Sequence, residues 1–160
     1  MNIKFNPRAS DRWQRGLAMV EFAISAPVVL LLLFATVELS HFIIAYSTLN
    51  DAVRDAARYV AGAALQGTSD LIVQGNAWST LVTQGKNLAV FGTVSATGSP
   101  LLPSLSVANI TVTEDIVNNN ITVLASYPYQ SLFGGSMPNF FGGSIATNFT
   151  LSISTTMRAT

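Results

Sequence analysis

The sequence of 160 residues contains no cysteine and a single histidine, and these two shortages exclude several kinds of site. Without cysteine there can be no disulfide, no thiolate metal ligand, no cysteine nucleophile and no lipid-carrying cysteine. With His41 as the single histidine, a metal site that needs a histidine pair is excluded as well. Phosphate-binding loops and dinucleotide fingerprints are also missing, so we expect no cofactor and no metal.

Charge is equally scarce: 10% of the residues are charged, against roughly a quarter in ordinary soluble domains. Four basic residues stand near the N-terminus: Lys4, Arg8, Arg12 and Arg15. No domain-wide basic face follows them, so we do not expect a nucleic-acid partner. Basic residues beside an apolar run mark the cytoplasmic side of a membrane, which places the N-terminus inside and the C-terminal part outside.

The apolar run that follows spans residues 17–37 and is long enough to cross a bilayer. About twenty residues cover a hydrocarbon core of ~30 Å. A cleaved secretory signal is the alternative, but its apolar region is shorter, at roughly 7–15 residues. We therefore predict a membrane helix over residues 17–46, with a kink at Pro27 and the lipid bilayer as its partner.

The rest of the chain is predicted to form a projecting helix and a small outer domain. We expect a basic leader over residues 1–16 that is disordered over 1–15, an amphipathic continuation of the span over 47–67, and an α+β domain over 68–160. The buried stripe of the projecting helix is predicted from its helical spacing. Its members are Tyr46, Leu49, Val53, Ala56, Ala57, Val60 and Ala64.

Within the outer domain, a second helix is expected near residues 69–90, interrupted at Gly75 and Gly85. Alternating β-branched residues predict a hairpin of residues 107–113 and 121–127 and a third strand over 146–157, with an exposed glycine-rich loop at 133–143. Three short strands need a helix on one face. The fold class is thus α+β: a long N-terminal transmembrane helix packed at its outer half on a small antiparallel sheet.

The pair Gly16 and Glu21 carries the most specific chemistry. A carboxylate at the start of a membrane span is costly, so we expect it to have a partner. A peptidase at a membrane face needs a small residue before the bond it cuts, and Gly16 meets that need. Cleavage would free the α-amine of Leu17, which is positively charged near neutral pH. Glu21 is then predicted to pair with such an amine on a neighbouring subunit.

A second polar pair is Glu38 and His41, three residues apart on one helix face near the outer end of the span. Two ligands do not make a metal site, and we predict an intramembrane or interfacial polar pair. No catalytic set stands out elsewhere, since no Gly-x-Ser-x-Gly motif occurs, and the protein is not expected to be an enzyme.

Taken together, the segments Gly16–Ala23, Val37–Ser40 and Ala52–Tyr59 resemble the TadE-like family, the minor pseudopilins of tight-adherence (Flp) type IV pilus systems. The resemblance covers about residues 13–62 and departs from the family at His41, where the family tends to have arginine. It implies a pilin-like long helix, cleavage between Gly16 and Leu17 by a prepilin peptidase, and a role in pilus biogenesis and cell adhesion. It also implies a single-pass bacterial inner-membrane protein with a periplasmic C-terminal domain. The implied partners are other pilins or pseudopilins and inner-membrane pilus assembly proteins.

The alternative is an uncleaved bitopic membrane protein whose outer domain binds a ligand. Its site would be lined by aromatic residues, namely Trp78, Tyr127, Tyr129, Phe140 and Phe141. A membrane-anchored enzyme is a third class. The measured mass of the N-terminal segment distinguishes these hypotheses, because a mature chain that begins at Leu17 is expected only for a pseudopilin.

Overall fold

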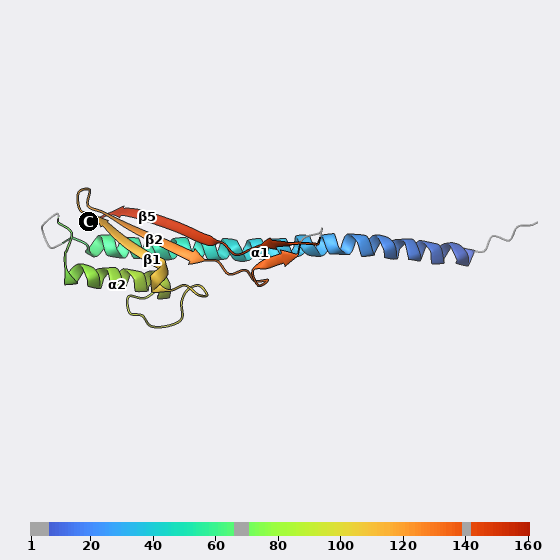
Figure 1. Ribbon diagram of the computed structural model, residues 1–160, viewed down its shortest axis with the longest axis horizontal. Coiled ribbons are helices and arrows are strands. Elements are labelled where there is room, and N and C mark those ends of the chain that lie inside the picture. Colours follow the sequence, from blue (N-terminus) through green and yellow to red (C-terminus); the bar gives the residue numbers. More distant parts are fainter. Residues whose placement is uncertain (1–6, 66–70, 139–141) are drawn as a thin grey trace, which may run out of the picture.

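The computed structural model describes residues 7–65, 71–138 and 142–160 (Figure 1). The α+β fold class is confirmed: a long apolar helix at the N-terminus is followed by a second helix and a small antiparallel sheet. In chain order the elements are α1 (Pro7–Ala63), α2 (Asn76–Phe91), the short 3-10 helix η1 (Val107–Asn109), β1 (Ile110–Asp115), β2 (Asn120–Pro128), β3 (Ser136–Pro138), β4 (Ser144–Ala146) and β5 (Thr150–Arg158).

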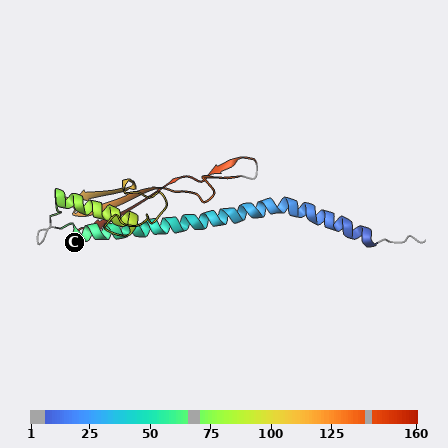
Figure 2. The same cartoon turned by 90° about the horizontal axis from the view of Figure 1, so that it is seen from below.

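Helix α1 is one continuous element of 57 residues, which at about 1.5 Å per residue is about 85 Å long. It begins at Pro7, so the prediction of a disordered leader is wrong for residues 7–15. Proline is favoured in the first turn of a helix, where its missing N–H leaves no hydrogen bond unmade. Figure 2 shows that the blue, N-terminal part of α1 bends, in keeping with Pro27 inside the helix.

The outer half of α1 supplies one side of the core, much as its spacing predicts. Six of the seven stripe residues are fully buried: Leu49, Val53, Ala56, Ala57, Val60 and Ala64. Tyr46 is 47% exposed, and Ala45 is buried in its place. Five of these six side chains are alanine or valine, so α1 can approach the sheet and α2 closely.

Helix α2 packs against α1 through its buried residues Leu81, Gly85, Ala89 and Val90. The prediction that Gly85 interrupts this helix is wrong. A Cβ atom at Gly85 would collide with the side chain of Val60, so glycine here permits close helix packing. Gly75 does mark a boundary: it precedes the helix with a φ of 69°, a conformation that glycine adopts readily.

The three-stranded sheet has the order β1-β2-β5 with both pairs antiparallel. Ala125 in β2 lies opposite Ile110 in β1 and Ile153 in β5, and all three are buried. The hairpin is thus confirmed, but β1 begins three residues later than predicted because residues 107–109 form η1. Strand β2 packs on α1 and β1 contacts α2, so both helices cover the same face of the sheet.

The segment predicted to be an exposed loop, residues 133–143, contains β3, which pairs with β4 just after the segment to form a second, two-stranded sheet. Because residues 144–146 belong to β4, the third strand of the main sheet begins at Thr150 instead of residue 146. In both views the β3–β4 hairpin extends beyond the main sheet in the direction of the N-terminal half of α1, and in Figure 2 it stands apart from the helix (Figures 1 and 2).

Candidate functional site

The part of α1 that is left largely uncovered by the rest of the domain is as long as a bilayer core. From Gly16 to Val37 every residue is exposed or half-buried, and Glu38 is the first buried residue. These 22 residues rise by about 33 Å, against ~30 Å for the hydrocarbon core. Large apolar side chains such as Leu17 and Leu32 are exposed there, at 72% and 65%. Among the described residues, α1 is the helix that is long and apolar enough to cross a membrane.

Gly16 has no structural reason to be glycine. A Cβ atom at this position would meet nothing within 4 Å, and the residue lies inside the continuous helix α1. Glycine inside a helix costs about 0.5–1 kcal/mol relative to alanine. The described residues show no gain in packing that offsets this cost.

Glu21 is exposed on the bare part of α1. No hydrogen bond or ion pair links it to any residue whose side chain the structure describes. Leu17 lies four residues earlier, so the two side chains share one face of the helix. Glu21 therefore enters the bilayer region without a counter-ion from the described side chains.

Glu38, at the outer end of the bare segment, is held by the segment that follows β2. It is 8% exposed and is the buried charged residue of the described chain. The hydroxyl of Tyr129 donates a hydrogen bond to Oε1 at 2.8 Å, and the backbone N–H of Leu132 donates to Oε2 at 3.2 Å. Each carboxylate oxygen thus accepts one hydrogen bond from a segment more than 90 residues away in the sequence.

His41 joins this cluster through the same tyrosine, with Nδ1 3.0 Å from the Tyr129 hydroxyl oxygen. That hydroxyl has one proton and donates it to Glu38, so His41 must donate from Nδ1. The two residues predicted as a polar pair are therefore bridged by Tyr129. We call the cluster of Glu38, His41, Tyr129 and the Leu132 N–H the carboxylate clamp.

Burial raises the pKa of the Tyr129 hydroxyl well above its ordinary value, and the hydrogen bond to Glu38 and its negative charge add to this effect. The hydroxyl consequently stays protonated over the whole physiological pH range, as a donor to Glu38 must. Tyr129 is 3% exposed and its ring stacks on Phe149 at 5.0 Å, while Phe42 packs edge-on at 5.8 Å. Packing therefore fixes the ring that carries the donor.

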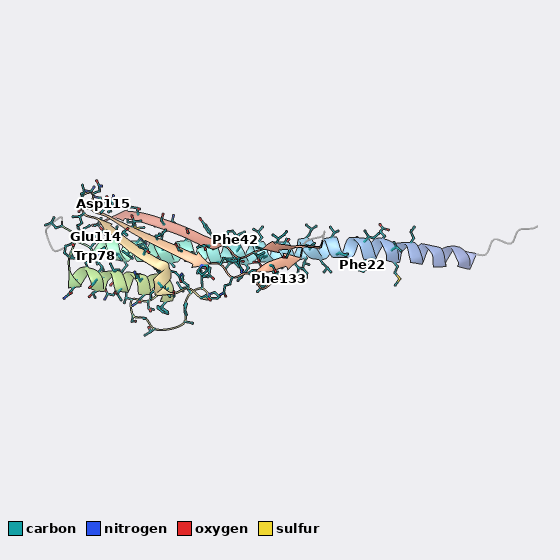
Figure 3. All side chains as sticks on the ribbon, in the orientation of Figure 1. Phe22, Phe42, Trp78, Glu114, Asp115 and Phe133 are labelled. Atoms are coloured by element: carbon teal, nitrogen blue, oxygen red, sulfur yellow. The ribbon has the colours of Figure 1, made fainter. Side chains whose placement is uncertain are left out.

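A further aromatic contact extends this packing toward the bare helix. The rings of Phe34 and Phe133 are 5.2 Å apart, and Phe34 lies four residues before Glu38 on α1. Figure 3 shows Phe42 and Phe133 where the sheet gives way to the hairpin, and Phe22 farther along α1.

The aromatic residues considered for a ligand site have other roles in this structure. Trp78 is half-buried against the core, and the Tyr127 hydroxyl donates to the carbonyl of Pro103 at 3.0 Å. Tyr129 belongs to the clamp, and residues 140 and 141 lie outside the described residues. In the described part of the chain, no three His, Asp or Glu side chains gather into a group able to hold a metal.

The fold and these contacts define a membrane-anchored protein in which the described residues contain one candidate membrane helix, and the C-terminal domain is fastened to the C-terminal end of the bare segment of that helix. The model of the TadE-like protein family matches residues 16–58, from Gly16 to the buried stripe of α1. The match confirms the resemblance to that family over this segment, and the family is pilus-related and non-enzymatic. No curated protein and no solved structure matches the chain. The chain is accordingly a membrane-anchored protein related to Tad pili.

Sequence reasoning missed that Tyr129, considered there only for a ligand site, and Leu132 are the hydrogen-bonding partners of Glu38. Ninety-one residues separate Tyr129 from Glu38, and no local pattern links them. The available signal was the free-energy cost of burying the Glu38 carboxylate, which requires hydrogen-bond donors but does not identify them.

Proposed function

We propose that this protein is a non-enzymatic minor pilin or pseudopilin that takes part in assembly of a Flp-type, tight-adherence pilus. The observation that carries the proposal is that neither the glycine at position 16 nor the carboxylate of Glu21 has a packing or hydrogen-bonding role among the side chains that the structure describes. They stand at the start of a bare apolar helix, in the segment that matches the TadE-like family. An external peptidase accounts for the glycine, and external partners account for the carboxylate.

The peptidase step is cleavage of the bond between Gly16 and Leu17. This bond lies inside a helix, and a peptidase that binds its substrate as an extended chain has to unwind it locally. Glycine lowers the cost of unwinding, because it is about 1 kcal/mol less favourable in a helix than alanine. It also leaves room for the enzyme to approach the backbone. Cleavage would remove the basic leader and create a cationic amine at the start of the span.

The assembly step pairs that amine with Glu21 while bare segments of neighbouring subunits pack side by side. A charge pair within an apolar bundle is costly to break, because removing one member leaves the other unpaired. The N-terminus would be cytoplasmic and the outer domain periplasmic, with the inner membrane as the site of assembly. The expected partners are a prepilin peptidase, other pilins or pseudopilins, and inner-membrane assembly proteins.

The cleavage assignment is tested by the N-terminal mass of the protein from membranes of cells that express a prepilin peptidase. The wild-type chain is expected to begin at Leu17, and Gly16→Asp is expected to keep the leader. Gly62→Asp is the matched control, because Gly62 also lies in α1 with open space around its Cβ position. Full-length wild-type protein in those cells would refute the assignment.

The pairing is tested by Glu21→Ala, which is expected to insert normally but to recover less of the host's Flp pilin on co-purification. Asp51→Ala is the control, since Asp51 is an exposed acid on the outer half of α1. Equal recovery of the pilin with all three proteins would contradict pairing of Glu21 with the amine of a neighbouring subunit.

A further inference from the structure

The β3–β4 hairpin and the turn that leads into it lie where the outer surface of a bilayer would be. The bare part of α1 ends at Val37, and the carboxylate clamp begins one residue later. Phe133, in the turn before β3, packs on Phe34, which lies about 6 Å closer to the N-terminus than Glu38 along the helix axis. Along the helix axis, the turn therefore extends past Val37, the residue at which the bare part of α1 ends.

The exposed side chains of this region suit lipid better than water. Leu132 is 59% exposed, Ile145 57% and Phe149 46%, and Phe133 is also exposed. No charged residue occurs in the sequence between Asp115 and Arg158, a stretch that includes β2, the hairpin and nearly all of β5. Glu38, the acid beside the turn, has both oxygens bonded within the clamp.

The opposite end of the outer domain has the reverse character. Glu114 and Asp115 lie at the far end of the sheet from Phe133 (Figure 3). The turn next to them exposes Val117, but the charges that flank it keep that end in water. The domain thus has a charged outer end and an uncharged apolar end, and the apolar end points along α1 toward its bare segment (Figure 2).

We infer that the β3–β4 hairpin rests in the interface of the outer leaflet and forms a second contact of this chain with phospholipid. The depth is limited by the backbone. Strands β3 and β4 pair with each other along one edge each, and the other edges need water or head groups as hydrogen-bonding partners. The hairpin therefore belongs at the glycerol and head-group level, with its apolar side chains directed into the upper acyl chains.

Lipid is the favoured occupant because the anchor belongs to the same polypeptide. The Phe34–Phe133 contact and the clamp fasten the segment that leads into the hairpin to the end of the bare part of α1, without any partner protein. A neighbouring subunit would meet this surface only after assembly. The inference depends on the membrane anchor and not on cleavage at Gly16.

The test uses single cysteine variants, since the native chain has no cysteine to remove. Ile145→Cys carries an environment-sensitive NBD label on the hairpin. Val117→Cys, 91% exposed at the charged end, is the matched control, and Leu30→Cys reports on the span. Each full-length variant is placed at low density in vesicles of phosphatidylethanolamine and phosphatidylglycerol that contain lipids brominated at a shallow or a deep position.

We expect the Ile145 label to emit at shorter wavelength than the Val117 label and to be quenched several-fold more strongly by the shallow bromolipid. The deep bromolipid should quench Leu30 instead. An Ile145 label that behaves like Val117 overturns the inference. A second result also overturns it: an Ile145 label that is shielded from water but not quenched by either bromolipid, with shielding that increases with protein density. A second copy of the protein would then cover the hairpin. A Leu30 label that neither bromolipid quenches would overturn both the inference and the prediction that α1 spans the membrane. The cleavage test of the proposed function is independent of all three outcomes.

Discussion

Replacing Tyr129 by phenylalanine should open the carboxylate clamp while leaving the aromatic packing intact. The ring that stacks on Phe149 is kept, and only the hydroxyl is lost. Glu38 Oε1 then has no donor, and His41 Nδ1 has no acceptor. A hydrogen bond to a charged group contributes about 1.5–3 kcal/mol, so a loss of ~2 kcal/mol is expected.

The assay is amide hydrogen exchange at Leu132, whose N–H donates to the other oxygen of Glu38. If the clamp opens as a unit, ~2 kcal/mol corresponds to exchange that is roughly 30-fold faster, at about 1.4 kcal/mol per tenfold. The measurement is made on the full chain in detergent micelles, so that the anchor stays solvated.

Tyr127→Phe is the matched control for this prediction. Tyr127 is equally buried and its hydroxyl donates to a neutral backbone carbonyl, that of Pro103, at 3.0 Å. Its loss should cost about 1 kcal/mol of global stability without faster exchange at Leu132. Unchanged exchange at Leu132 in Tyr129→Phe, or an equal effect in Tyr127→Phe, would refute the idea that the hydroxyl and the amide hold Glu38 together.

The remaining predictions concern packing and titration. Gly85→Ala should lower the free energy of unfolding of the outer domain by about 1–3 kcal/mol in denaturant unfolding, because the new methyl group collides with Val60. Gly62→Ala is the control and should be neutral or stabilising, because the space around that position is open. The side-chain and backbone hydrogen bonds of Asn118 lower the pKa of the Asp115 carboxyl, so this group contributes stability above its ordinary pKa of 3.8, lost as pH falls through the lower folded-state pKa. Asn118→Ala should therefore move the NMR-measured pKa of Asp115 upward, and an unchanged value would contradict this account.

The sequence predicted those elements whose signal is periodic and local. The stripe from Leu49 to Ala64 repeats at helical spacing, and the asparagine run at 118–120 marks the turn of the main hairpin. Strands β3 and β4 were missed because three residues are too few to show an alternation. Gly85 was misread as a helix breaker, because its role, close packing against Val60, depends on the tertiary structure.

The same distinction applies to the site. Gly16, Glu21, Glu38 and His41 stood out because each is a residue type that is costly or unusual in its place. Their partners did not stand out. Tyr129 reaches Glu38 only because β2 ends beside α1 and Pro128 closes the strand, so that the next residue turns toward the helix. A contact of this kind is a product of the sheet register, which the sequence of either segment alone does not contain.

The two acids at the ends of the bare segment differ in one respect that separates folding from assembly. Glu38 finds both of its donors within the chain, so it needs no partner protein. Glu21 finds none among the described side chains, and cleavage would place an amine on Leu17, one turn away on the same face. Helical side chains lean toward the N-terminus, so Glu21 can reach the amine of its own chain as well as that of a neighbour. The two arrangements predict different results for the Glu21→Ala variant. If Glu21 pairs with the amine of its own chain, Glu21→Ala should destabilise each subunit alone and leave pilin recovery unchanged. If it pairs with the amine of a neighbouring chain, Glu21→Ala should lower pilin recovery. In that case amide exchange at Leu132, which reports on Glu38, should stay at its wild-type rate.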